Sequence, residues 1–190
     1  MFVFYTLSTE QVLNKNKRIE NLLKLLADAD SNALGELYDL IKTDVYAYAL
    51  SKIKNKADAE DIMQDTFVNI YRYAKQYQAK GKPLAWIFTI ELNLIRRKIQ
   101  VESRTCELDD GLLNVSEKTN TEDTIIDNQF LQQLLGGLEE EEREIITLHI
   151  VSGLKHREIA KLLDKGLSTI LSKYNRAIKK LQILVREQNK

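Results

Sequence analysis

The sequence predicts an all-α protein in which an acidic linker joins two helical domains. Proline occurs once and glycine seven times in 190 residues, so few positions would break a helix. No segment alternates between apolar and polar residues with the period of two that a half-buried strand shows. Apolar residues make up 44% of the chain, which is enough for a core, and they recur at helical spacing.

Residues 17–100 form the first predicted domain, in which five helices follow one another. Asp30 or Ser31 is the expected N-cap of the second helix. A turn at residues 55–56 and a break at residues 80–83 separate the later helices. The expected helices cover residues 19–26, 33–41, 44–55, 58–77 and about 84–100.

Residues 101–122 are polar, acidic and without helical periodicity, and they are predicted to form the linker. Residues 123–190 form the second predicted domain. It opens with an apolar stripe over residues 125–135, which precedes two consecutive glycines. No internal repeat and no extended low-complexity tract interrupts this organisation.

A helix-turn-helix is predicted in the second domain. A short apolar helix at residues 159–163 is followed by a break at Asp164-Lys165-Gly166. A longer amphipathic helix then runs over residues 167–181. The second helix of such a motif lies in the DNA major groove, so the pattern indicates a DNA-binding protein.

The longer helix presents one polar face to a groove. Thr169, Ser172, Lys173 and Arg176 share this face at spacings of three and four residues. Lysine and arginine reach guanine edges or phosphates, so we expect Lys173 to contribute specificity and Arg176 to contact phosphate. Leu171 falls on the core side of the helical wheel and is expected to pack rather than read DNA. The alternative is that the face is only a solvated basic surface.

The charge of the chain is zero overall but is unevenly distributed. Residues 145–190 have 10 basic and 3 acidic side chains, the electrostatic pattern expected for contact with phosphates. Residues 100–144 have 3 basic and 13 acidic side chains. We expect this acidic segment to lie away from DNA or to mimic it.

The helix predicted at residues 58–77 has an acidic ridge opposite its apolar stripe. Asp58, Asp61 and Asp65 are three and four residues apart, so they line one exposed face beside Gln64. One interpretation is a solvated face with acids near the helix N-terminus, where the helix dipole favours them. The other is a docking surface for a basic partner.

The helix predicted at residues 84–100 is apolar on two flanks, with a narrow polar strip between them. An aromatic ring, an amide and guanidinium groups can stack on bases, pair with base edges and hold phosphates. The alternative is a core tryptophan with surface arginines. The strip contains Trp86, Thr89, Asn93, Arg96, Arg97 and Gln100.

Several other functions find no support in the sequence. Cys106 is the only cysteine, which excludes an internal disulfide and suits a reducing cytoplasm. Cys106, His149 and His156 match no zinc-ligand spacing, so we expect no metal and no cofactor. The sequence contains no glycine-rich phosphate-binding loop and no nucleophile motif, so no motif indicates an enzyme. No apolar run approaches the roughly 20 residues that insertion into a membrane requires.

Three motifs in order resemble the bacterial extracytoplasmic-function (ECF) sigma factors, the two-domain members of the RNA polymerase sigma family. The resemblance covers most of residues 20–185 and includes Leu138 through Leu181, which resembles the carboxy-terminal domain. The quoted motifs are Asp58-Ala-Glu-Asp-Ile-Met-Gln-Asp-Thr-Phe67, Trp86-Ile-Phe-Thr-Ile-Glu-Leu-Asn-Leu94 and Ser172-Lys-Tyr-Asn-Arg-Ala177.

The resemblance implies a function for each domain. Residues 17–100 would be sigma domain 2, which binds core RNA polymerase. The helix at residues 84–100 and the loop at residues 78–84 would open and read the minus-ten promoter element. Residues 123–190 would be sigma domain 4, which contacts the beta flap and reads the minus-thirty-five element. Promoter DNA and core polymerase are the implied partners, an anti-sigma protein is a further candidate, and the protein would act in the cytoplasm.

The resemblance also assigns roles to single residues. The beta-prime clamp helices would bind Asp58, Asp61, Gln64 and Asp65. The minus-ten element would contact Trp86, Thr89, Asn93, Arg96 and Arg97. The minus-thirty-five element would contact Arg157, Thr169, Ser172, Lys173 and Arg176.

Two other functions fit parts of the sequence. The first is a sigma-like DNA-binding regulator without polymerase docking, against which the acidic ridge argues. The second is a polymerase-binding module without promoter melting, to which Leu171 and the zero net charge point. The chain departs from the family at Leu171 and the Asp164-Lys165-Gly166 turn, and also at Arg97 and Glu139.

Overall fold

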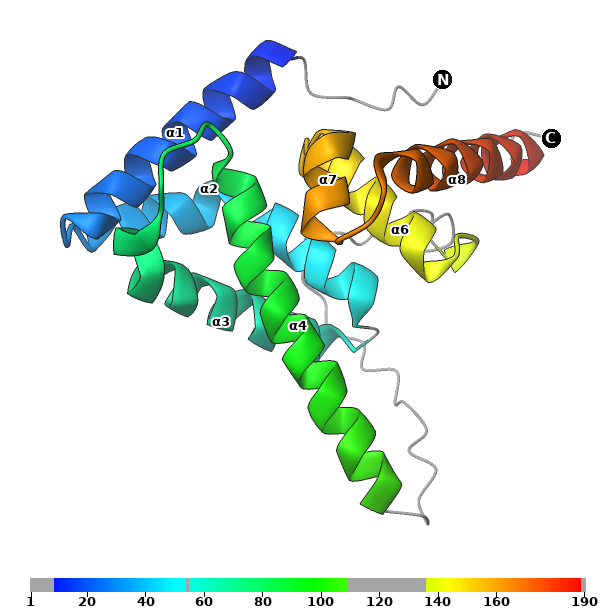
Figure 1. Cartoon of the computed structure of the whole chain (residues 1–190), viewed down its shortest axis with the longest axis horizontal. Helices are drawn as coiled ribbons and strands as arrows, with labels where there is room; N and C mark the ends of the chain where they lie inside the picture. The colour runs from blue at the N-terminus through cyan, green and yellow to red at the C-terminus, as the bar shows by residue number, and fades with distance from the viewer. Residues whose placement is uncertain (1–8, 54, 109–135, 189–190) are drawn as a thin grey trace.

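The computed structural model describes residues 9–53, 55–108 and 136–188, and within these ranges every regular element is a helix, as predicted (Figure 1). The α-helices are α1 (Thr9–Ala27), α2 (Asn32–Lys52), α3 (Lys56–Tyr73), α4 (Pro83–Leu108), α6 (Glu140–Ile146), α7 (His156–Leu162) and α8 (Leu167–Gln188). A short 3-10 helix, η1 (Ala74–Gln76), follows α3, and a π-helical turn, η2 (Thr147–Val151), follows α6.

Several predicted helix boundaries are wrong: α1 begins at Thr9 and not at residue 19, and α8 continues to Gln188. The helices expected at 33–41 and 44–55 are one continuous helix, α2, because Lys42 and Thr43 between them are compatible with a helix. Helix α4 continues to Leu108, so residues 101–108 of the expected linker are helical. The remainder of the linker and the apolar stripe at 125–135 lie outside the described residues.

The local start signals act where the sequence places them. The carboxylate of Asp30, rather than the Ser31 hydroxyl, accepts the hydrogen bond of the Asn32 N–H at 3.0 Å. Asn55 caps α3 by accepting the Ala57 N–H at 2.9 Å. Pro83 occupies the first position of α4, where a missing N–H costs nothing.

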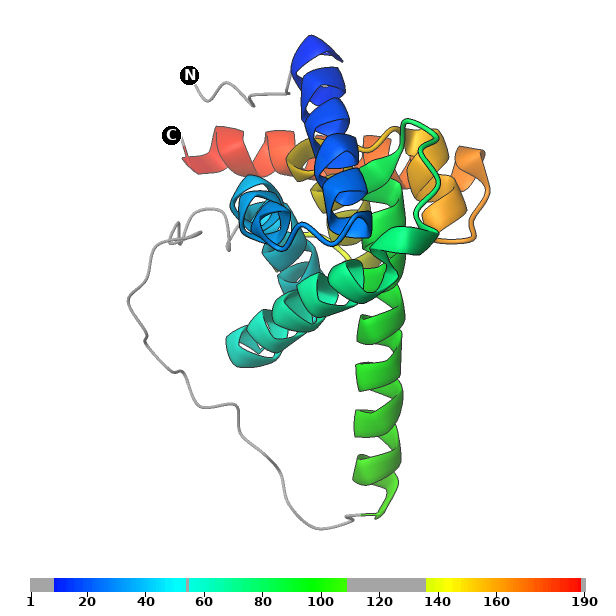
Figure 2. The same ribbon diagram turned by 90° about the vertical axis from the view of Figure 1, so that its left-hand side faces the viewer.

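Helices α1 to α4 enclose a core that continues without a break into the second domain. Tyr48 of α2 and Phe88 of α4 meet edge to face at its centre, with ring centroids 5.3 Å apart. Leu148 of η2 and Ile159 of α7 belong to the same buried cluster. Helix α6 packs on α2 and α7 packs on α4, so the described parts of the two domains form one body (Figures 1 and 2).

Polar contacts also join the domains. The buried Tyr48 hydroxyl donates a hydrogen bond to Glu144 at 2.9 Å. Lys52 lies 2.8 Å from Glu140 and 3.3 Å from the same Glu144 carboxylate. These contacts satisfy a carboxylate that would otherwise be costly to bury.

Within the described ranges, no helix combines the length and apolar character needed to cross a bilayer.

Glu91 of α4 is a buried acid in the core of the first domain. Its side chain is fully covered, and neither carboxylate oxygen has a hydrogen-bond partner of good geometry among the described residues. Burial raises the pKa of Glu91 well above its ordinary value, and the charge of Asp44 adds to the shift. Burial therefore favours the protonated form of Glu91 in the folded protein, although a backbone hydrogen bond with Ala49 partly opposes this shift in pKa.

We predict that Glu91→Leu stabilises the protein at neutral pH by about 1–3 kcal/mol, because it removes a buried carboxyl whose hydrogen bonding is poorly satisfied. The folded pKa lies above the unfolded one, so the wild-type protein loses stability as pH rises above the ordinary pKa of 4.5. The gain should therefore grow between about pH 4 and pH 7. Urea denaturation at several pH values measures it.

Glu36→Leu, at an exposed position on α2, provides the control. It should change the free energy of unfolding by less than about 0.5 kcal/mol. Equal effects of the two substitutions at every pH would contradict the assignment of a buried neutral carboxyl.

Candidate nucleic-acid interface

The polar strip predicted on α4 is present on the surface. Thr89, Asn93, Arg96 and Arg97 are exposed, and Trp86 is partly exposed. The flanks that bury the helix are Ile87, Phe88, Leu92 and Ile95, all at or near zero exposure. Ile99, which was expected on a flank, is exposed, because α4 extends past the domain core at this end (Figure 2).

The strip borders a pocket of about 300 Å³ between α4 and the end of α3. Trp86, Asn93 and Arg97 line it, so the structure brings together three of the five residues expected to contact the minus-ten element. Thr89 and Arg96 are not among the lining residues. The Thr89 hydroxyl instead donates to the Ala85 carbonyl oxygen at 2.7 Å.

The other wall of the pocket comes from residues that the sequence analysis missed. Asn69, Tyr73 and Gln76 line it from α3 and η1. Asn69 and Tyr73 are four residues apart and therefore share a helix face, a signal that was available in the sequence. The pocket combines two aromatic rings, three amides and one guanidinium group, which are the groups that stack on bases and bond to their edges.

The loop beside this pocket is fixed by α1. One carboxylate oxygen of Glu20 accepts hydrogen bonds from the Tyr77 hydroxyl at 2.7 Å and from the Gly81 N–H at 2.8 Å. Burial and the hydrogen bond to Glu20 raise the pKa of Tyr77 above its usual value. The Tyr77 ring lies 5.2 Å from that of Trp86, so Glu20 positions the loop against the pocket. Gly81 adopts φ +69°, which a larger residue rarely does.

The acidic ridge of α3 divides into two parts. Asp61, Gln64 and Asp65 are exposed along the helix. Asp58 is only partly exposed, and its carboxylate lies 2.6 Å from Lys98 of α4. This hydrogen bond raises the pKa of Lys98. The structure therefore places Asp58 in a contact within the domain, and leaves the other three side chains open to a partner.

The helix-turn-helix is formed as predicted by α7 and α8. Its turn includes Asp164 at φ 53°, and the N–H of Lys165 donates to the Ala160 carbonyl oxygen at 2.9 Å. Arg157 on α7 is exposed, as are Thr169, Ser172 and Arg176 on α8. The expectation that Leu171 packs in the core is wrong, because its side chain is exposed. It lies at the flank of the apolar stripe, where no helix of the described residues covers it.

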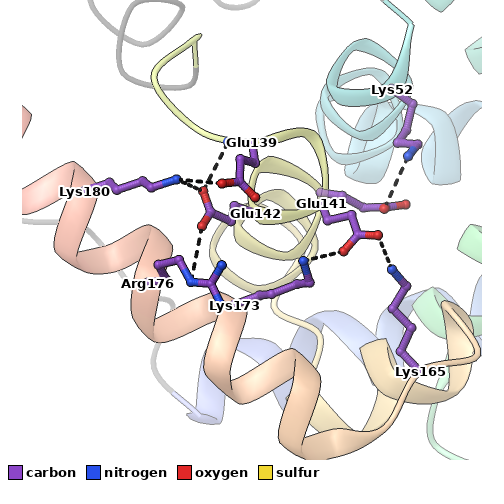
Figure 3. Close-up of polar contacts among 9 residues, drawn as sticks. Lys52, Glu139, Glu141, Glu142, Lys165, Lys173, Arg176 and Lys180 are labelled. Carbon is purple, nitrogen blue, oxygen red and sulfur yellow. Dashed lines mark hydrogen bonds and ion pairs between the residues drawn. The ribbon is translucent and has the colours of Figure 1, made fainter.

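Lys173 is held by an acid on a neighbouring helix. Its Nζ lies 2.6 Å from one oxygen of Glu141, and Lys165 contacts the other oxygen (Figure 3). The hydrogen bonds from Lys165 and Lys173 lower the pKa of Glu141 to about 2. The carboxylate is therefore ionised at neutral pH and holds both lysines toward α6.

Glu142 makes a second set of contacts with α8. Although burial opposes ionisation, hydrogen bonds from Lys180 at 2.7 Å and from the Glu139 N–H at 3.1 Å lower the pKa of Glu142. Arg176 Nε lies 3.9 Å from its other oxygen (Figure 3). The acidic segment at residues 100–144 and the basic segment at residues 145–190 therefore pair with each other through α6 and α8.

Sigma-70 region 2 matches residues 37–105, and Sigma-70, region 4 matches residues 130–181. The ECF RNA polymerase sigma factor BldN of Streptomyces coelicolor is 27% identical over 88% of this chain and 66% of its own length. The ECF RNA polymerase sigma factor SigK of Mycobacterium ulcerans is 27% identical over 85% of this chain and 90% of its own length.

Solved structures agree with the family matches. The sigma factor RpoE in complex with the anti-sigma factor NepR from Bartonella quintana has a TM-score of 0.66 and 25% identity, over 80% of this chain and 96% of that one. CnrH, solved with the cytosolic domain of CnrY, has the same fold, with a TM-score of 0.61 and 22% identity over 90% and 98% of the two chains.

The chain belongs to the sigma-70 family of RNA polymerase sigma factors. Within that family it is an ECF sigma factor, which directs RNA polymerase to promoters. The resemblance and the all-α fold are thereby confirmed. The roles of single residues stay predictions.

We predict that Glu141→Gln strengthens binding to non-specific duplex DNA, because it releases Lys165 and Lys173 for phosphates. Each added phosphate contact should steepen the dependence of log K on log salt by about 0.9. Fluorescence anisotropy over a salt series measures both effects.

Glu140→Gln is the matched control, since it removes the same charge from the adjacent position but contacts Lys52 of the first domain. Identical salt slopes for the two variants would show that Glu141 does not restrain these lysines from DNA.

Proposed function

We propose that this sigma factor acts through three surfaces. Asp61, Gln64 and Asp65 on α3 would dock on the beta-prime clamp helices of core polymerase. The pocket between α3 and α4 would capture a base of the opened minus-ten element. Helix α8 would read the minus-thirty-five element, with domain 4 against the beta flap. The observation on which the proposal rests is the pocket lined by Trp86, Asn93 and Arg97.

The chemistry of the pocket supports capture of a single base. Taking a base out of the stack costs a few kcal/mol, which the pocket must offset. Trp86 and Tyr73 supply ring faces for stacking, and Asn93 supplies a donor and an acceptor for a base edge. Arg97 at the rim suits the adjacent phosphate. Binding of this kind opens DNA without forming or breaking a covalent bond, so we propose a cytoplasmic initiation factor that is not itself an enzyme.

An anti-sigma protein is a further proposed partner. Two structurally similar proteins were solved in complexes, the sigma factor RpoE with the anti-sigma factor NepR and CnrH with the cytosolic domain of CnrY. Purification of the full chain from its own cells tests this proposal. We expect an anti-sigma partner to co-purify with the chain in a fixed molar ratio.

Run-off transcription tests the proposed function directly. The full chain is mixed with core polymerase and genomic DNA, and the transcripts are sequenced. Initiation downstream of one shared pair of promoter elements supports the proposal. Binding to polymerase without initiation would favour a polymerase-binding module that does not melt promoters. DNA binding without polymerase binding would favour a sigma-like DNA-binding regulator.

We predict that the double reversal Asp61→Lys and Asp65→Lys weakens binding to core polymerase by several kcal/mol, because like charges would meet across the interface. The circular dichroism spectrum should not change, since both side chains are exposed. Glu36→Lys with Asp39→Lys makes the same change of charge on exposed positions of α2 and should leave the affinity unaltered. Similar affinities for the two double variants would remove the docking role from α3.

We predict that Asn93→Ala slows open-complex formation on duplex promoters by roughly tenfold, since a good base contact contributes about 1–3 kcal/mol. A fluorescent base analogue in the minus-ten element reports the opening. The loss should be smaller on a template that is already melted, where capture no longer competes with stacking. Gln100→Ala, on the same strip but outside the pocket, is the control. An equal loss on both templates would assign Asn93 to simple affinity instead of melting.

A further inference from the structure

Leu171 is an apolar side chain on the outer surface of α8. The residues that pack this helix against its domain, Ile170, Ala177 and Leu181, are buried, whereas Leu171 is 39% exposed. It lies in the second turn of the helix. The first turns of the second helix in a helix-turn-helix are the part that contacts base edges in the major groove. The exposed Leu171 therefore lies in the part of α8 that would contact base edges.

An exposed row with the spacing i, i+3, i+4 and i+7 runs along the first half of α8: Ser168, Leu171, Ser172 and Asn175. All four side chains are uncharged. Lys173, the basic residue of these turns, is only 21% exposed, and its Nζ is held 2.6 Å from Glu141. The start of α8 thus presents hydroxyl, amide and apolar groups, and its cation points toward α6 (Figure 3).

The chemistry of the major groove limits what such a row can recognise. Guanine offers two acceptors, for which arginine or lysine is the usual partner. Thymine alone among the four bases adds an apolar group, the C5 methyl, to its groove edge. A leucine gains free energy only by covering apolar surface, so the thymine methyl is the base feature that Leu171 can read.

We propose that Leu171 is a specificity residue that packs on the C5 methyl group of one thymine in the minus-thirty-five element. This inference rests on the proposed role of α8 as the reader of that element. The serine on each side of Leu171 in the row, Ser168 and Ser172, can bond to either kind of base pair. The leucine therefore supplies the preference for thymine at this position.

Uracil in place of thymine tests the proposal, because the substitution removes the methyl group and nothing else. The holoenzyme first selects its minus-thirty-five element from duplex promoters that are random at this element. Each selected thymine is then replaced singly by deoxyuracil. We expect one replacement to weaken holoenzyme binding by about fourfold, which corresponds to burial of one methyl group. The others should have little effect.

The protein variant completes the test. Leu171→Ala should weaken binding to the thymine duplex by at least about fourfold and lose the uracil effect at that one position. Ile183→Ala removes another apolar side chain of α8, 56% exposed and farther along the helix, and should retain the effect. If Leu171→Ala keeps the uracil effect, or if no thymine shows it while the element is still selected, the proposal is overturned and α8 remains the reader. If no sequence is selected at the element, the proposed role of α8 fails and the inference with it.

Discussion

The carboxylates of the short helix α6 determine how the rest of the second domain is arranged. Glu141 and Glu142 bind the turn and the second helix of the helix-turn-helix, through Lys165, Lys173 and Lys180. One turn later, Glu144 accepts a hydrogen bond from the Tyr48 hydroxyl of the first domain. A helix of seven residues therefore orients α8 on one side and holds α2 on the other. A buried ion pair contributes little net stability because removing its charges from water costs free energy, so we expect the pairs of Glu142 to act mainly by fixing the position of α8.

The contact between α6 and α2 also limits what the protein can bind in this arrangement. Promoter elements named for positions about 25 base pairs apart lie roughly 85 Å apart along straight duplex DNA. The two domains pack directly on each other around one shared core. If α4 and α8 read the two elements as proposed, contact with both at once would require the second domain to leave the first. The polar contacts of Tyr48 and Lys52 can be exchanged for water on separation, and the shared apolar core opposes it.

Helical periodicity was sufficient to predict the fold class, the helix-turn-helix and the exposed strip of α4, because each depends on the spacing of residues within one helix. It did not reveal the pairing of Lys173 with Glu141 or the contacts of Glu20 with the loop at Gly81. Those depend on which helices are neighbours, and a single sequence does not contain that information. Leu171 shows a further limit. On a helical wheel it lies at the edge of the apolar stripe. Whether a side chain at this edge is buried depends on how the neighbouring helices pack against it.

The ion pairs within the second domain also reduce the number of lysines that this DNA-binding protein offers to phosphates. The basic segment at residues 145–190 would attract phosphates strongly if all its lysines were free. Three of those lysines instead contact glutamates of α6, so the sequence-independent attraction is reduced. Weak attraction to arbitrary DNA leaves a larger share of the binding free energy to base contacts and to the polymerase. A factor whose task is to select promoters benefits from this balance, because competing non-specific sites greatly outnumber the specific ones.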